Sequence, residues 1–249
     1  MAISYKSNLH DSERLFVLAI DQYEDGLKKG VLYHGKGQEG FRVDGYLELV
    51  RRMEAFFQQM QFPRLIMDQR TFRGGKGNPV PDREERGLAR RPGQAGTFTI
   101  RVNQRQNASW QGILQNPSTG EMHRFCSFLE LLCCLDEEMC KPGSNEAETA
   151  KEGQGTLQQR VERYLQQVMK CNETMKILPD TLVYRFRGAG GNRTFMVRPM
   201  FYEHGTCQGV LYWKESKKQK NFRSFLELVG MMSDAVRQEC DWAEQEEVV

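Results

Sequence analysis

Apolar and polar residues alternate in three separate segments of the chain, which begin at Phe16, Phe98 and Phe195. In the second segment, for example, Phe98, Ile100 and Val102 are separated by polar residues. This two-residue period is typical of a strand with one buried face. In each segment a polar stretch, a glycine and a second short apolar run follow, and this order predicts an antiparallel hairpin.

The apolar period then changes to that of a helix. Apolar residues recur three and four positions apart, which places them on one helical face. They are Tyr46, Leu49, Val50, Met53 and Phe57 in the first segment, Phe128, Leu131, Leu132, Leu135 and Met139 in the second, and Phe225, Leu228, Val229, Met232 and Val236 in the third. The pattern predicts an α+β fold with three internal strand–strand–helix repeats, whose antiparallel hairpins are each packed by one amphipathic helix.

The three segments align without a gap, and a glycine occupies the same place in each of them. These glycines are Gly30, Gly112 and Gly209. Each opens the second strand of its predicted hairpin. We interpret them as structural, because a glycine at such a place often marks a bulge or a close backbone approach.

A glutamate also recurs at the start of each predicted helix, at Glu48, Glu130 and Glu227. In the second and third segments a serine, Ser127 or Ser224, precedes the glutamate by three residues. This spacing predicts a capping box, in which serine and glutamate bind the free backbone amides of the first helical turn. We therefore interpret these residues as structural and not as catalytic.

The same patterns suggest how the chain is divided. We expect a first repeat unit in residues 1–62, and a leading strand, a mobile loop (74–96) and the second unit in residues 63–140. We then expect a linker in residues 141–155, an extra helix capped by Thr156 in 156–175, a leading strand and the third unit in 176–240, and an acidic tail in 241–249. The two leading strands are expected at residues 65–67 and 181–184.

Composition favours a folded protein outside membranes. The chain has 249 residues, of which 39% are hydrophobic and 27% charged, and it shows no apolar run long enough to span a bilayer. Its N-terminus lacks the layout of a signal peptide. The seven cysteines are odd in number and contain no C-x-x-C pair, which is typical of a reducing compartment. These features predict a cytoplasmic protein without membrane association.

The sequence offers no catalytic constellation. The cysteines and the four histidines lack metal-ligand spacing, and no serine or cysteine lies in a nucleophile motif. The glycine-rich segment that begins at Gly74 does not match a P-loop. We therefore predict no catalytic residue, no metal and no cofactor.

Charge is unevenly distributed along the chain. Residues 64–110 hold ten Arg and Lys against four Asp and Glu, and residues 176–223 hold ten against three, although the whole chain carries only +2. Basic strands and loops with interspersed aromatic residues fit a surface that binds a partner or a phosphate backbone. The candidate binding residues are Arg101, Arg105, Trp110, Trp213, Lys214, Lys217, Lys218 and Lys220.

The second and third segments resemble a module that recurs in bacterial proteins, with an apolar strand, W-x-G-x-V and then F-R-x-x-x-E-L before a short helix. Trp110-Gln111-Gly112-Ile113 and Phe125 through Leu132 carry the resemblance in the second segment, and Gln208-Gly209-Val210 and Phe222 through Val229 carry it in the third. Cys207 replaces the tryptophan and Cys126 the arginine. The resemblance implies a small structural module and brings no activity or site residues.

A shorter match concerns nucleotide binding. Asn107-Ala108-Ser109-Trp110-Gln111-Gly112 has the N-x-S-x-x-G form of PilZ domains that bind cyclic dinucleotides, and Arg86 and Arg90 give the upstream R-x-x-x-R form. The other two segments lack this match. The sequence therefore predicts a non-catalytic binding, adaptor or regulatory protein of the bacterial cytoplasm, which acts on an unidentified protein partner through hairpin and strand surfaces. The alternative is a protein that binds RNA or DNA through the basic surfaces.

Overall fold

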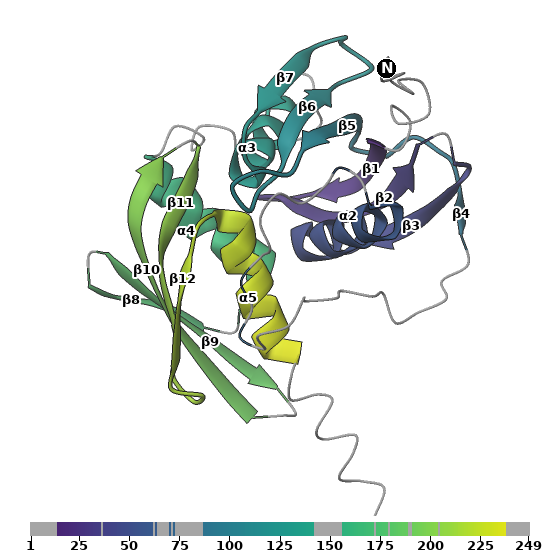
Figure 1. Ribbon diagram of the computed structural model, residues 1–249. Coiled ribbons are helices and arrows are strands. Elements are labelled where there is room, and N and C mark those ends of the chain that lie inside the picture. Colours follow the sequence, from purple (N-terminus) through teal and green to yellow (C-terminus); the bar gives the residue numbers. More distant parts are fainter. Residues whose placement is uncertain are drawn as a thin grey trace, which may run out of the picture.

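The computed structural model describes residues 14–35, 37–61, 63, 70, 72, 87–141, 156–171, 173–178, 180–188, 191–203 and 205–237. Strands in these residues form two antiparallel sheets (Figure 1). The first has the order β4-β3-β2-β1-β5-β6-β7. Its strands are β1 (Leu15–Tyr23), β2 (Leu27–His34), β3 (Glu39–Val43), β4 (Leu88–Ala89), β5 (Gly96–Gln104), β6 (Gln111–Gln115) and β7 (Met122–Phe125).

The second sheet has the order β12-β11-β10-β9-β8. Its strands are β8 (Glu173–Leu178), β9 (Thr181–Gly188), β10 (Gly191–Glu203), β11 (Thr206–Trp213) and β12 (Lys218–Phe222). The helices are α2 (Tyr46–Met60), α3 (Phe128–Met139), α4 (Leu157–Met169) and α5 (Phe225–Arg237). The predicted α+β class is confirmed, as are the extra helix after Thr156 and the leading strand at residues 181–184, which forms part of β9.

A third strand, which the sequence analysis did not predict, precedes the helix in each of the three segments. These strands are β3, β7 and β12. The described residues of β7 and β12 are mostly exposed, and only Phe125 and Phe222 at their ends are buried. Strands with so few buried residues give no apolar alternation in the sequence. Each predicted hairpin is therefore a three-stranded meander.

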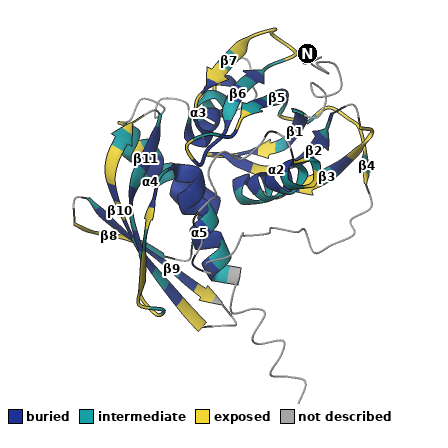
Figure 2. Cartoon of the chain, in the orientation of Figure 1, coloured by how far each residue is buried: buried dark blue, intermediate teal, exposed yellow. Residues whose placement is uncertain are grey.

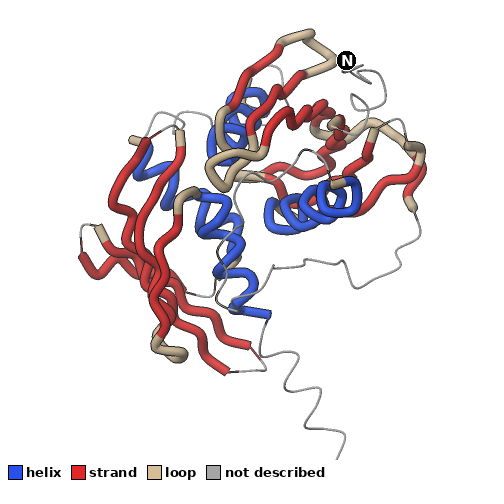
Figure 3. The backbone as a smooth tube through the Cα atoms, in the orientation of Figure 1, coloured by secondary structure: helices blue, strands red, loops and turns tan. Residues whose placement is uncertain are grey.

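The helices lie between the two sheets, as Figure 3 shows. Helix α4 contacts α2, α3 and α5, so the helices that cover the two sheets also pack on one another. One apolar core includes residues from both sheets and from all four helices. In Figure 2 the helices are coloured mainly as buried or intermediate, whereas exposed residues are frequent along strands such as β7 and β8. The outer faces and edges of the sheets lie outside this core.

A bulge faces each of the three recurrent glycines. The pairing between the first two strands of each segment skips one residue, which is Asp21, Asn103 or Met200. The residue before each skipped position pairs with Gly30, Gly112 or Gly209. A Cβ atom on Gly30 would lie 2.6 Å from the carbonyl oxygen of Ala19, and one on Gly112 would overlap the carbonyl oxygen of Arg101. The predicted close backbone approach is confirmed.

The serines cap their helices as predicted. The amide of Glu130 donates to the hydroxyl of Ser127, and the amide of Glu227 donates to that of Ser224, both at 3.0 Å. The two glutamates accept the amide of the residue before the cap, Cys126 or Arg223, at 2.7 Å. In each of these two helix starts, the serine and the glutamate therefore both accept a hydrogen bond from a backbone amide.

The first helix begins differently. Its N-cap is Gly45, and no side chain caps this end. Glu48 instead forms an ion pair with Arg52, at 2.8 Å from its Nε atom. The recurrent glutamate thus forms an ion pair in the first segment, whereas it accepts a backbone amide in the other two.

The same two serines join the sheets to each other. The hydroxyl of Ser127 donates to the carbonyl of Gly205, in the turn between β10 and β11, at 2.6 Å. The hydroxyl of Ser224 donates to the carbonyl of Ala108, in the equivalent turn between β5 and β6, also at 2.6 Å. The contact is reciprocal, as in a two-fold symmetric interface.

Aromatic packing completes this junction. The rings of Phe128 and Phe225, the first residues of α3 and α5, stack with centroids 6.2 Å apart. The backbone amide of each phenylalanine donates to a turn hydroxyl of its own segment, that of Ser109 at 2.9 Å or Thr206 at 3.0 Å. Hydroxyl, amide and ring contacts therefore fix the two helix starts against both turns.

The expected mobile loop at residues 74–96 needs a correction where the structure describes it. Residues 88–89 form β4, which pairs with β3. The hydroxyl of Tyr33 donates to the carbonyl of Ala89 at 3.0 Å, and Arg91 binds both carboxylate oxygens of Asp21 at 2.6 and 2.7 Å. This part of the loop is therefore fixed on the outer face of the first sheet, where Leu88 packs on a small apolar cluster.

Other predicted parts lie outside the described residues. They are the leading strand at 65–67, the linker apart from Lys141, residues 74–86 of the loop, and the tail at 241–249. Among the helices that the structure describes, none has the length and apolar character needed to cross a membrane.

We predict that Gly112→Ala destabilises the protein by about 1–3 kcal/mol, because the added methyl group overlaps a backbone carbonyl that the sheet holds in place. Chemical denaturation gives the free energy of unfolding. Gly96→Ala is the control, since a Cβ there meets only side-chain atoms of Phe98 and Met139, at 3.0 and 3.2 Å or farther. Equal losses in the two variants would contradict the close approach.

Candidate binding surface

Two predicted binding residues, Trp110 and Arg105, lie in the core, and this corrects their expected role as surface contacts. Trp110 is 0% exposed, and its indole Nε1 donates to the Glu54 carboxylate at 2.6 Å. The guanidinium of Arg105 binds the other oxygen of Glu54 and lies 5.0 Å above the ring centroid of Phe57. These side chains connect α2 to the second segment and do not reach a partner.

The electrostatics of this buried group fit a structural role. Burial raises the pKa of the Glu54 carboxyl above its usual value, although Arg105 and Trp110 oppose the shift. Burial also lowers the pKa of the Arg105 guanidinium, against the attraction of Glu54. Since desolvation dominates both shifts, the pair is costly to bury, and removal of one partner would leave a buried charge uncompensated.

Trp213 is a core residue as well. It is 4% exposed and packs against Phe72 and Phe195, with ring centroids 5.6 and 5.9 Å apart. Arg101 and Lys220 are half-buried, whereas Lys214, Lys217 and Lys218 are exposed in and beside the turn between β11 and β12. Of the predicted binding residues, these three lysines are thus fully presented at the surface and lie close together.

The turn with the three lysines lies beside a second basic segment. The amide of Lys214 donates to the carbonyl of Thr194 on β10 at 2.9 Å, and β10 pairs with β9 through Thr194 and Arg185. One end of the second sheet therefore collects basic side chains from strands far apart in the sequence. This basic end consists of Arg185, Arg187, Lys214, Lys217, Lys218 and Lys220. Two acidic residues lie close to the basic end: Glu173 pairs with Arg185, and Glu215 accepts the amide of Thr194.

Exposed apolar side chains concentrate on another part of the same sheet. Among the described residues, six large apolar side chains are between 42 and 67% exposed. Five belong to the second sheet and one, Met122, to β7 of the first. We call the five the apolar edge: Met175, Ile177 and Leu178 on β8, and Met200 and Phe201 on β10. Larger exposed apolar patches mark interaction sites.

Three residues of the apolar edge lie on β8, the last strand of the sheet (Figure 1). In the part of the chain that the structure describes, β8 pairs with β9 alone, so its other side presents free backbone amides and carbonyls. The turn after β8 is tied to β10, because Arg198 Nε binds the carboxylate of Asp180 at 2.9 Å. Met200 follows two residues later, which places both groups of apolar residues at one end of the sheet.

Sequence reasoning missed β8. The sequence pattern places residues 173–175 in the region of the extra helix and predicts a strand only from residue 181 onward. A signal was present: the run from Glu173 to Leu178 ends at Pro179 and Asp180, immediately before the next strand. Two short runs around such a turn are typical of a hairpin. The strand contains two charged residues, which obscured its pattern.

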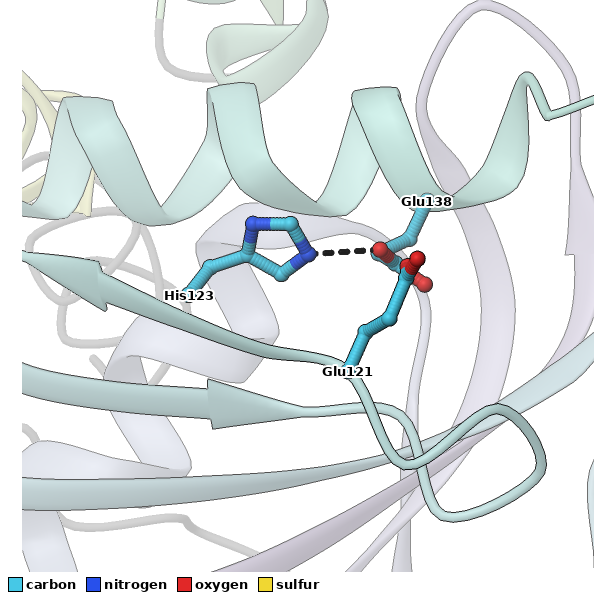
Figure 4. A group of neighbouring side chains, drawn as sticks. All are labelled: Glu121, His123 and Glu138. Atoms are coloured by element: carbon cyan, nitrogen blue, oxygen red, sulfur yellow. Dashed lines mark hydrogen bonds and ion pairs between the residues drawn. The ribbon is translucent and has the colours of Figure 1, made fainter.

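The fold also brings together potential metal ligands that are not close in sequence. Glu121 and His123 from the β7 segment face Glu138 of α3, and the histidine Nε2 lies 2.6 Å from the glutamate (Figure 4). The ammonium of Lys141 also binds Glu138, at 2.6 Å, and contacts Glu121, while Asn116 donates to the second Glu138 oxygen at 2.7 Å. A metal ion would have to displace the lysine, so we assign this cluster to the packing of β7 on α3.

A second polar cluster lies where the first segment, α3 and α4 meet. Asp136 of α3 accepts hydrogen bonds from the hydroxyls of Tyr23 and Tyr164, and from Arg163 at 2.9 Å. The hydroxyl of Tyr23 also lies 3.2 Å from that of Tyr46. Burial raises the pKa of the Asp136 carboxyl, against its tyrosine and arginine partners. Both carboxylate oxygens are occupied, which indicates a structural junction between the first unit, α3 and α4.

Comparison of the chain with protein-family models, with curated proteins and with solved structures gives no match.

We predict that Arg105→Met destabilises the protein by about 3–5 kcal/mol, because it leaves the Glu54 carboxylate buried without its cation. Arg124→Met is the matched control: Arg124 is exposed on β7, so its loss is expected to change stability by less than about 0.5 kcal/mol. Urea unfolding of the three proteins checks this. A folded Arg105→Met protein of unchanged stability would contradict the structural role.

Proposed function

We propose that the chain is a non-catalytic binding or adaptor protein, and that its contact surface is the apolar edge. The observation that carries the proposal is the coincidence of exposed apolar side chains with a free strand edge on β8. A partner segment in extended conformation can pair with such an edge through its backbone, while the apolar side chains provide further contact area. The partner is therefore a protein.

The proposal includes a place of action, the bacterial cytoplasm. In support, Cys126, Cys133, Cys134, Cys171 and Cys207 are free thiols, as expected in a reducing compartment. Burial raises the pKa of Cys207 to about 12, so this thiol stays protonated and inert near neutral pH.

We also propose that the three segments are copies of one folding unit. In support, β1-β2-β3-α2, β5-β6-β7-α3 and β10-β11-β12-α5 have the same order of elements. Each carries its bulge opposite the recurrent glycine. The shared residues thus build the unit, and the binding surface comes from strand β8 and from positions that differ between the units.

Peptides that bind the full chain can be selected from a displayed random library. We predict that the selected peptides bind the Ile177→Lys variant with an affinity at least about tenfold lower than that of the wild type. The change removes a contacting apolar side chain, whose full burial stabilises by about 1.5–3 kcal/mol, and adds a charge. Met122→Lys, on an exposed edge of the other sheet, is expected to bind like the wild type. Anisotropy titrations measure both. Selection of no peptide, or equal binding to all three proteins, would contradict the proposal.

A second candidate function, nucleic-acid binding, is favoured by one observation: basic side chains from β9, from the turn after β11 and from β12 lie at the basic end. Such a cluster matches a phosphate backbone in charge. It is the second candidate because Glu173 already pairs with Arg185, at 3.1 Å, and lies 4.0 Å from Arg187.

For this candidate we expect single-stranded RNA to bind more weakly as salt rises, with a slope of log K against log salt of about −0.7 for each phosphate contact. The variant Lys214→Gln/Lys217→Gln/Lys218→Gln should flatten the slope by about two. Lys28→Gln/Lys29→Gln, exposed on β2, is the control. Weak binding that salt does not change would remove this candidate.

A further inference from the structure

The apolar edge carries one charged side chain at its centre. Lys176 pairs with the buried Leu182 of β9 and therefore points to the inner face of the sheet, whereas Met175 before it points to the outer face. Ile177, the next residue, is skipped in the pairing with β9 and forms a bulge. Its ammonium binds a carboxylate oxygen of Glu162, on α4, at 3.0 Å, so this face is the one that the helices cover. The lysine side chain remains 46% exposed. A strand added at this edge would place one of its own side chains directly opposite this cation.

The central lysine argues against a second copy of the chain as the occupant. Two copies paired antiparallel through β8 are related by a two-fold axis, so one residue lies opposite itself. The register centred on Lys176 pairs Met175 with Ile177 twice, but it sets two ammonium groups against each other. Like charges directly opposite one another are destabilising.

The neighbouring symmetric registers are also unfavourable. If Met175 lies opposite itself, Glu173 falls opposite Ile177 and Leu178 has no partner residue. If Ile177 lies opposite itself, Lys176 falls opposite Leu178 and the first three residues of β8 have no partner within the strand. Each register therefore either opposes like charges or sets a charge against an apolar side chain.

We propose that the apolar edge binds an extended segment of another protein with the pattern apolar–acidic–apolar, whose acidic residue lies opposite Lys176. The two apolar residues then pack against Met175 and Ile177 on the outer face, and the carboxylate completes an ion-pair network with Lys176 and Glu162 on the inner face. An ammonium group has three donors, so it can serve two carboxylates. The inference rests on the proposed binding function and adds the chemistry of the partner.

The geometry makes the pattern specific. Alternate residues of the partner strand point to alternate faces, so the acidic residue must lie between the two apolar ones. All strand pairs of this sheet are antiparallel, and the added strand is assigned the same direction. A segment with lysine or arginine at the central position would bring two cations together.

Two synthetic fluorescent peptides test the inference. Both alternate valine and threonine; the acidic peptide has glutamate in place of its central threonine, and the basic peptide has lysine there. Anisotropy titrations with the full chain should show that the acidic peptide binds about five times more tightly or better, because an opposed charge pair contributes up to about 1 kcal/mol. Ile177→Lys should weaken the binding of the acidic peptide, whereas Met122→Lys should not.

The matched variant is Lys176→Glu/Glu162→Lys, which keeps the net charge and an ion pair between these positions. Its preference should reverse, so that the basic peptide binds more tightly; thermal unfolding followed by circular dichroism verifies that it folds. If the variant does not fold, Lys176→Gln replaces it, and the preference of the wild type should shrink to less than twofold.

Three outcomes would overturn the inference. Equal binding of the two peptides, with loss of binding in Ile177→Lys, would leave the proposed binding function intact and remove the acidic pattern. Failure of both peptides, together with failure of the library selection, would remove the binding function as well. A dimer in analytical ultracentrifugation that dissociates in Ile177→Lys would identify a second copy as the occupant.

Discussion

The arrangement of the two sheets depends on the reciprocal contact between the starts of α3 and α5. Ser127 and Ser224 each cap their own helix and donate to a carbonyl of the other sheet, at Gly205 and Ala108. Both carbonyls belong to residues with positive φ, 66° and 53°. A buried carbonyl that loses its donor costs about 1–3 kcal/mol, so each serine connects helix formation to sheet docking. A glycine is required at position 205 for a steric reason as well, because a Cβ atom there would overlap the Glu130 carboxylate.

This junction determines which faces of the two sheets are covered by helices. Because the helices lie between the sheets, one helical layer covers the apolar inner faces of both sheets. The recurrent residues Glu130 and Glu227 bind backbone amides at the helix starts. The second sheet nevertheless ends in β8, a strand with no counterpart in the order of elements of the three segments. Most residues of the proposed surface therefore lie on a strand outside the recurrent elements, whereas Met200 and Phe201 lie on β10 within the third unit.

The sequence predicts the parts whose physical cause is local. The bulge glycines, the serine caps and the helix after Thr156 follow from spacing, and they are present. The site is harder to predict. Trp110 and Arg105 look like a basic, aromatic surface in the sequence, but both bind a single acid from another segment, Glu54, in the core. The sequence alone does not pair residues so far apart, and it does not distinguish an exposed basic strand from a buried ion pair.

The four sheet edges differ in a way that supports the choice of β8. Natural sheets protect their edges by short strands or by charged side chains. Strand β4 has two residues, β7 carries His123 and Arg124, and β12 carries Lys218 and Lys220. Strand β8 has six residues, three of them apolar and exposed, and one lysine that is held toward α4. A single inward cation disfavours pairing with a second copy and, in the proposed complex, favours an acidic residue in the partner strand, so one residue would supply both protection and specificity.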